Sequence, residues 1–180
     1  TPEPTVRVSD IVADLDKAFA PIRTGRFFVR NAAGIFKVPQ NVIRSRKANN
    51  LPAIAHETGH ALHKLLWKPE GRSGLSAKDF PVQFHGELKP LCPPGYSPNK
   101  HVYEGFAEFV RLYLTDHVQA QQAAPSFHAY FEKTIAQYPE VTKVLAKAQA
   151  DIAKWIQQPA QARVRSTIVD GSTKERVTVG

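Results

Sequence analysis

Apolar residues recur at helical spacing between Leu51 and Trp67, which predicts an amphipathic helix. We expect a core stripe along this helix, formed by Leu51, Ala55, Leu62 and Leu66. Asn49 or Asn50 can serve as the N-cap, and Pro52 lies in the first turn, where its missing N–H costs nothing. Gly59 is the one poor helix former, which we expect to be tolerated if another element packs closely against it.

The residues before this helix predict one helix and a small sheet. The segment Ser9–Phe19 is amphipathic and can begin with Ser9 or Asp10 as its cap. Three short segments rich in β-branched and aromatic residues follow, separated by turn residues at 31–34 and 39–41, and we expect them to be strands: Gly25–Arg30, Gly34–Val38 and Val42–Arg46.

The C-terminal half reads as mainly helical. Helical spacing covers residues 103–114, a segment from Ala124 to about Tyr138, and an Ala- and Lys-rich segment from Pro139 to about Gln158. Residues 163–179 resemble a hairpin that turns at Asp170-Gly171. We therefore expect an α+β domain at 1–160, with 161–180 forming a C-terminal hairpin or a linker to a following domain.

The polar face of the helix at 51–67 carries the sequence His56-Glu57-Thr58-Gly59-His60. Two histidines four residues apart lie on the same face of a helix, so both imidazoles can bind one metal ion. The glutamate next to the first histidine is turned about a quarter-circle away from the pair. This arrangement is typical of a catalytic zinc helix, in which the glutamate acts as a general base.

A catalytic zinc ion needs a third protein ligand. A metzincin site would place a histidine six residues after the motif, where the chain has Leu66. Glu87 lies at a distance that suits a thermolysin-like site, but Gly86 and Pro90 argue against a helix there. The best candidate is Glu104, because the helix predicted at 103–114 presents it on a face with other charged residues.

The sequence resembles the gluzincin metallopeptidases, and among them the catalytic domain of lethal-factor-type toxins and related peptidase domains of phage and mobile-element proteins. The resemblance covers about residues 35–138 and is carried by His56–Ala61, Glu104–Leu112 and Ala123–Glu132. It implies a zincin-like fold, in which a small twisted sheet precedes a pair of metal-binding helices. It also implies that the protein is part of a larger multidomain protein.

The resemblance further implies a role for each residue of the site. One zinc ion would be held by His56, His60 and Glu104. Glu57 would be the general base, which takes a proton from water acidified by the metal. Glu108 would accept a hydrogen bond from a ligand imidazole, and Arg111 would pair with Glu108 across one turn. In the toxins a tyrosine ahead of the third ligand faces the metal, and Tyr96 is the nearest match, with Tyr103 as its competitor.

Composition narrows the class of protein. The chain has 180 residues, of which 42% are hydrophobic, enough for one domain with a core. Cys92 is the single cysteine, so a disulfide scaffold is excluded and a free thiol is expected. No apolar run approaches membrane-spanning length, so we expect no membrane partner. No signal peptide is visible, and the absence of Met suggests a piece of a longer protein with no indication of its compartment.

Positive charge is concentrated ahead of the zinc helix. The formal net charge is +8, and residues 17–56 contain eight Lys and Arg but no Asp or Glu. One interpretation is a solvated outer face. The other is that the strands between Arg26 and Arg46 attract an acidic peptide. Nucleic acid is a less favoured partner, because no nucleic-acid-binding motif accompanies the charge.

Two functional hypotheses follow from these residues. The first is a zinc endopeptidase that hydrolyses protein or peptide substrates. The second is a non-catalytic zincin-fold module that binds protein or nucleic acid. Glu57 favours the enzyme, because a module that needed only the metal would have no use for a base beside it.

Overall fold

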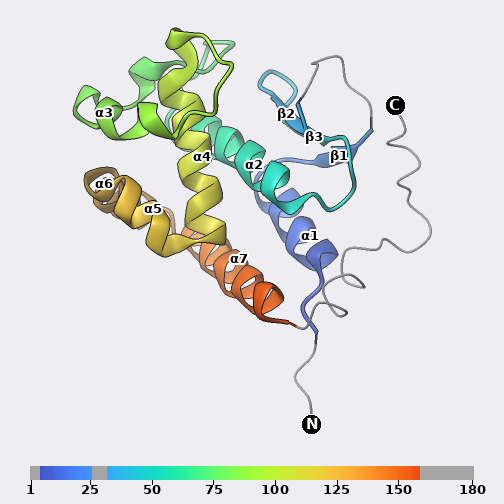
Figure 1. Ribbon diagram of the computed structural model, residues 1–180. Helices are drawn as coiled ribbons and strands as arrows, with labels where there is room; N and C mark the ends of the chain where they lie inside the picture. Colours follow the sequence, from blue (N-terminus) through green and yellow to red (C-terminus); the bar gives the residue numbers. More distant parts are fainter. Residues whose placement is uncertain (1–4, 26–31, 159–180) are drawn as a thin grey trace.

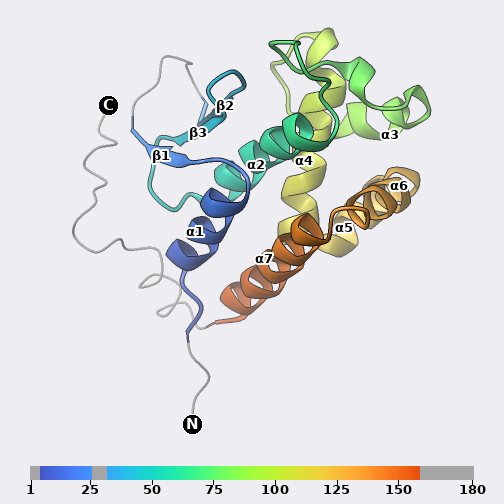
Figure 2. The ribbon, with the colours of Figure 1, turned by 180° about the vertical axis from the view of Figure 1, so that it is seen from behind.

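Two crossing helices form the centre of the molecule in the computed structural model, which describes residues 5–25 and 32–158. These helices are α2 (Leu51–Leu66) and α4 (His101–Thr115). The small sheet and α6 (Pro125–Ile135) lie on opposite sides of this pair in Figures 1 and 2. The architecture is α+β, as the sequence predicts.

Helix α2 begins as its sequence predicts. The side chain of Asn50 accepts a hydrogen bond from the backbone N–H of Ala53 at 3.3 Å, and Pro52 lies in the first turn. Leu51, Ala55 and Leu62 are buried. The cap of α1 (Val8–Ala18) was wrongly predicted, because the helix begins one residue before Ser9, with Arg7 at the N-cap and no side-chain cap.

The sheet has three short strands in the order β1-β3-β2. Strand β1 (Ile22–Thr24) runs parallel to β3 (Val42–Ser45), and β2 (Gly34–Lys37) runs antiparallel to β3. Asn41 makes the turn between β2 and β3 with a φ of +55°. Strand β1 was not predicted, and it ends before Gly25, which has a φ of +147°. The strand predicted at Gly25–Arg30 falls, after Gly25, on residues 26–31, which lie outside the described part of the chain.

The other helices after α2 pack around α4, and the last of them also packs against α1. They include a single turn, α3 (His85–Leu88), then α5 (His117–Ala123), α6 and α7 (Pro139–Gln157). The sequence predicted α6 and α7 but neither α3 nor α5. Short 3-10 turns connect α2 to α4 at Ala77–Asp79, Val82–Phe84, Lys89–Leu91 and Pro98–Lys100.

The core lies where α2, α4 and α6 meet. Its aromatic rings pack both edge-to-face and tilted against one another, with centroids 4.6 to 6.1 Å apart, and come from Trp67, Phe80, Phe106, Phe109, Phe127 and Phe131. Burial of each such ring contributes about 1.5–3 kcal/mol, so this cluster fixes the positions of the central helices. None of the described helices is long and apolar enough to cross a membrane. The predicted hairpin at 163–179 lies outside the described residues.

Candidate metal centre

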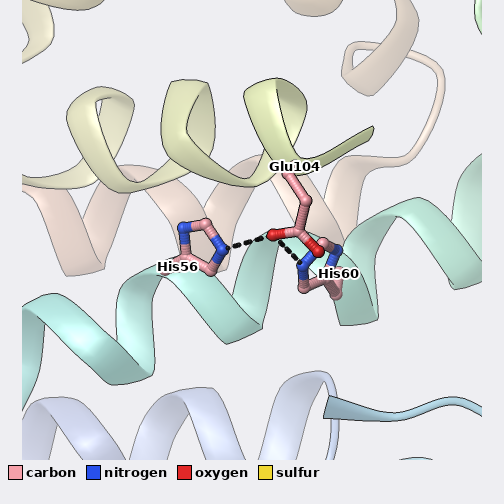
Figure 3. Close-up of side chains that lie close together, drawn as sticks. All are labelled: His56, His60 and Glu104. Carbon is pink, nitrogen blue, oxygen red and sulfur yellow. Dashed lines mark hydrogen bonds and ion pairs between the residues drawn. The ribbon is translucent and has the colours of Figure 1, made fainter. Parts of the chain in front are cut away.

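The two histidines of α2 and a glutamate of α4 converge on one point between the helices (Figure 3). His56 Nε2 lies 3.0 Å from Glu104 Oε1, and His60 Nε2 lies 3.1 Å from the same oxygen. All three side chains are buried. They form a group that can hold a metal ion, with one ligand atom from each residue.

A close contact between helix backbones sets the distance between these ligands. A Cβ placed on Gly59 would lie only 2.7 Å from the Cα of Ala107, so no side chain fits where α2 crosses α4. Gly59 lies between the two histidines, and Ala107 lies one turn after Glu104. The glycine in the motif therefore allows the helices to approach until their ligands meet.

The separations suit a small tetrahedral ion. In a tetrahedral zinc site, a nitrogen about 2.0–2.1 Å and an oxygen about 2.0–2.2 Å from the ion lie about 3.3–3.5 Å apart. The two N···O distances, 3.0 and 3.1 Å, are shorter than this by only about 0.2–0.5 Å. Two imidazoles and one carboxylate are also the ligands that zinc accepts at catalytic sites, so the donor set fits this ion.

The charges of the site favour a cation. Burial lowers the pKa of His56, but its hydrogen bonds to Glu104 and Glu108 outweigh burial and raise the pKa to about 10. Burial raises the pKa of Glu104, but the hydrogen bonds from His56 and His60 outweigh it and lower the pKa to about 2. The site thus stabilises positive charge next to ionised carboxylates.

A second carboxylate orients the first histidine. Glu108 Oε2 lies 2.7 Å from His56 Nδ1, and Glu108 Oε1 accepts a hydrogen bond from Arg111 Nε at 2.8 Å. The chain Arg111–Glu108–His56 fixes the ring so that Nε2 faces Glu104. Within the described residues, His60 Nδ1 is buried without a hydrogen-bond partner. The two histidines are therefore held differently: both ring nitrogens of His56 contact carboxylates, whereas His60 contacts a carboxylate through Nε2 only.

Glu57 is buried beside the metal-binding group and is not a member of it. Burial raises the pKa of its carboxyl above the ordinary value, against the opposing effect of His60 and His56. A Cβ on Gly34 would lie 3.3 Å from Glu57 Cγ, so a glycine at the start of β2 leaves room for this carboxylate. A carboxylate with a raised pKa next to a metal group is suited to proton transfer near neutral pH.

A cleft of about 360 Å³ opens onto these residues. Its lining includes Glu57, His60 and Glu104, together with Gly34, Ile35 and Phe36 of β2. Strand β2 is an edge strand of the described sheet. An extended chain in this cleft would lie alongside that edge and next to the metal-binding group.

Tyr96 and Tyr103 both line the same cleft. Burial, followed by the charges of Glu104 and Glu57, raises the pKa of Tyr96 far above its ordinary value. Burial and Glu104 also raise the pKa of Tyr103, whose ring packs 6.1 Å from that of His60. Both phenols therefore stay protonated and can donate a hydrogen bond, and the charges of both Glu104 and Glu57 act on Tyr96.

A buried network beside the site was not predicted from the sequence. His63 is fully buried, and its Nε2 lies 2.7 Å from Asp79 Oδ2, which also pairs with Arg72. Burial lowers the pKa of His63 to about 4 in spite of Asp79, so the neutral ring donates its Nε2–H to the carboxylate. His63 therefore ties the segment around Asp79 to α2 and is packed away from the cleft.

Glu87 and Cys92 lie outside the metal-binding group. Glu87 accepts hydrogen bonds from the backbone N–H groups of Ser126 and Phe127 at the start of α6, at 3.2 and 2.8 Å. Its segment is helical against expectation, because Leu88 is buried and its carbonyl contacts α4 at Gly105. Cys92 is a free thiol that donates to the carbonyl of Pro93 at 3.2 Å and is not among the cleft-lining residues.

The basic segment contributes structural bonds as well as charge. Arg46 Nε donates to the carbonyl of Ala32 at 2.6 Å, and Arg44 is partly buried on β3. Lys37 is exposed at the end of β2. Arg26 and Arg30 lie outside the described residues, so acidic-peptide binding along these strands stays a prediction.

Comparisons with protein-family models, with curated proteins and with solved structures found no match for this chain.

Proposed function

We propose that the protein is a zinc-dependent endopeptidase with a zincin-like fold, in which His56, His60 and Glu104 hold the metal ion. The observation that carries this proposal is the position of Glu57. It lines the same cleft as His60 and Glu104 and is not one of the residues that can hold the ion. A purely structural metal site needs no buried carboxylate at that place.

Each residue has a defined part in peptide hydrolysis. When bound, a zinc ion supplies a Lewis acid that acidifies water and polarises the scissile carbonyl. Glu57 removes a proton from the attacking water, and the water oxygen bonds to the carbonyl carbon. The C–N bond then breaks, and Glu57 delivers the same proton to the leaving amine. The hydroxyl of Tyr96 donates a hydrogen bond to the carbonyl oxygen as negative charge develops there. Such a donor stabilises the transition state by about 3 kcal/mol.

Substrate binding follows from the edge strand. An extended peptide can add to β2 through main-chain hydrogen bonds, because β2 borders the cleft. Strand addition places a peptide bond, and not a chain terminus, beside Glu57. This supports an endopeptidase acting on unfolded or extended protein segments.

The test is cleavage of a random peptide library by the zinc-loaded protein, with and without a chelator. We expect internal cleavage that the chelator abolishes and that zinc restores. Glu57→Gln should bind zinc as the wild type does but lose nearly all activity, whereas Glu70→Gln, an exposed glutamate after the same helix, should change nothing. A protein that binds zinc yet cleaves no peptide would instead be a non-catalytic binding module.

A further inference from the structure

A second group of metal-ligating side chains lies at the opposite end of α4 from Glu104. It consists of His117 at the first position of α5 and of His128 and Glu132 on α6. His117 Nε2 lies 2.7 Å from His128 Nε2 and 4.0 Å from Glu132 Oε2. His128 and Glu132 are one helical turn apart and share a face, so three donor atoms meet at one place.

We propose that His117, His128 and Glu132 form a second metal site, which binds zinc or a similar divalent transition ion. Two imidazole nitrogens and one carboxylate oxygen select such ions over calcium and magnesium, which prefer oxygen ligands. The proposal does not depend on peptidase activity, because none of these residues contacts the cleft between α2 and β2.

The geometry needs only a small adjustment to accept the ion. Two nitrogens that bind one tetrahedral zinc ion lie about 3.3 Å apart, so the imidazoles must separate by about 0.6 Å from their present hydrogen-bonded contact. The side chain of His117 is 42% exposed and can move, whereas that of His128 is 7% exposed and held in the core. Solvent can reach the exposed side and supply a fourth ligand.

A neighbouring tyrosine already orients the carboxylate. The hydroxyl of Tyr113, on α4, donates a hydrogen bond to Glu132 Oε2 at 3.1 Å. The Tyr113 ring also packs against that of His117, with centroids 4.8 Å apart. Such an outer contact is common for carboxylates that bind metals. The site therefore draws on α4, α5 and α6, and its orientation is set before any ion binds.

The role of the ion would be to fasten α5. This helix has seven residues, and Ala120 is the only one of them that is buried. So short a helix has little stability of its own. An ion shared by His117 and the two α6 residues would join α5 to a helix that is held by Phe127 and Phe131 in the core. Zinc should thus protect the α4–α5–α6 corner against local unfolding.

The experiment is a zinc titration of the full chain by calorimetry at pH 7.5. The wild type should bind two equivalents, the second more weakly. His117→Gln and Glu132→Gln, both at exposed positions, should keep the first equivalent and lose the second. His85→Gln, a histidine outside both groups, should retain two equivalents. Zinc binding by the wild type that is unchanged in both His117→Gln and Glu132→Gln, whether one equivalent or two, would overturn the proposal.

Hydrogen exchange provides an independent measurement on folded protein. Amides of residues 117–123 should exchange at least tenfold more slowly when zinc exceeds one equivalent, in the wild type and in Glu104→Gln but not in His117→Gln. If the amides of α5 are equally protected with and without the second equivalent, the ion does not fasten α5 and the proposed role is wrong.

Discussion

The described part of the chain contains two groups of two histidines and one glutamate, and they differ in what surrounds them. In the group between α2 and α4 every member is buried, and a further carboxylate and an arginine support one imidazole. In the group at α5 and α6, His117 and Glu132 are 42% and 47% exposed, and the outer contact is the neutral hydroxyl of Tyr113. The same ligands can therefore serve different purposes, because burial and a neighbouring base suit catalysis, whereas exposure and short helices suit stabilisation.

The largest effects on zinc binding should come from removing the carboxylate of one group at a time, which should also show that the two groups bind zinc independently. We expect Glu104→Gln to weaken binding of the first zinc equivalent by on the order of a thousandfold, since three ligands share a binding free energy of about 10–16 kcal/mol. Glu132→Gln should leave that equivalent unchanged. Competition with a chromophoric chelator measures both. If Glu87→Gln removes the metal while Glu104→Gln does not, the third ligand has been misassigned.

Acid should lower the stability of the fold by protonating His63, which is buried next to the first metal-binding group. The ring titrates near its ordinary pKa of 6.5 when unfolded and at about 4 when folded, so the unfolded state binds more protons between these values. The free energy of unfolding should therefore fall by about 3 kcal/mol from pH 6.5 to pH 4 because of this residue. In His63→Gln, which can still donate to Asp79 but does not titrate, this part of the decline should be missing. Urea unfolding at pH 7, 5 and 4 provides the comparison, and equal slopes in both proteins would contradict the assignment.

Filling the helix crossing should disturb the buried group only. Gly59→Ala adds a methyl group 2.7 Å from the Cα of Ala107, at a cost of about 1–3 kcal/mol, of which helix propensity recovers up to about 1. We expect the free energy of unfolding, measured by thermal unfolding, to fall by about 1–2 kcal/mol, and the first zinc equivalent to bind more weakly. Gly86→Ala in α3 has open space around the new methyl group and is the matched control. A Gly59→Ala protein as stable as Gly86→Ala would show that the crossing can relax.

The smallest effect should come from the carboxylate behind His56. Glu108→Gln removes the charged partner of Nδ1 and should weaken zinc binding about tenfold or slightly more, which is the low end for such supporting residues. Binding of the second zinc equivalent, at His117, His128 and Glu132, should not change. Isothermal titration of both equivalents tests this, and an unchanged first affinity would mean that packing alone holds the His56 ring.

The central helices could be predicted because their signals are local. All the signals for α2 lie within one stretch of sequence, which contains Asn50, Pro52 and the motif around Gly59. The carboxylates of α4 likewise lie close together in sequence, on one face of the helix. The convergence of His56, His60 and Glu104 then follows from two helices that each present ligands on one face.

The elements that escaped prediction depend on partners distant in sequence. The turn α3 exists because Leu88 is buried against α4 and Glu87 caps α6. Strand β1 is only three residues long and is defined by its pairing with β3. His63 finds Asp79 across sixteen residues without regular spacing. The pair His128 and Glu132, one turn apart in a predicted helix, was a signal that the sequence did offer for the second group.

The contact between Gly59 and Ala107 also has a consequence for which ions the buried group admits. Closer approach of α2 and α4 is blocked by their backbones, and separation would open a void in the core, so the gap between the His pair and Glu104 resists change in both directions. Ions whose bonds to oxygen measure 2.3–2.6 Å, such as calcium, would have to push the helices apart. We therefore expect the fixed crossing to favour small ions at this group, in addition to the preference set by its ligand atoms.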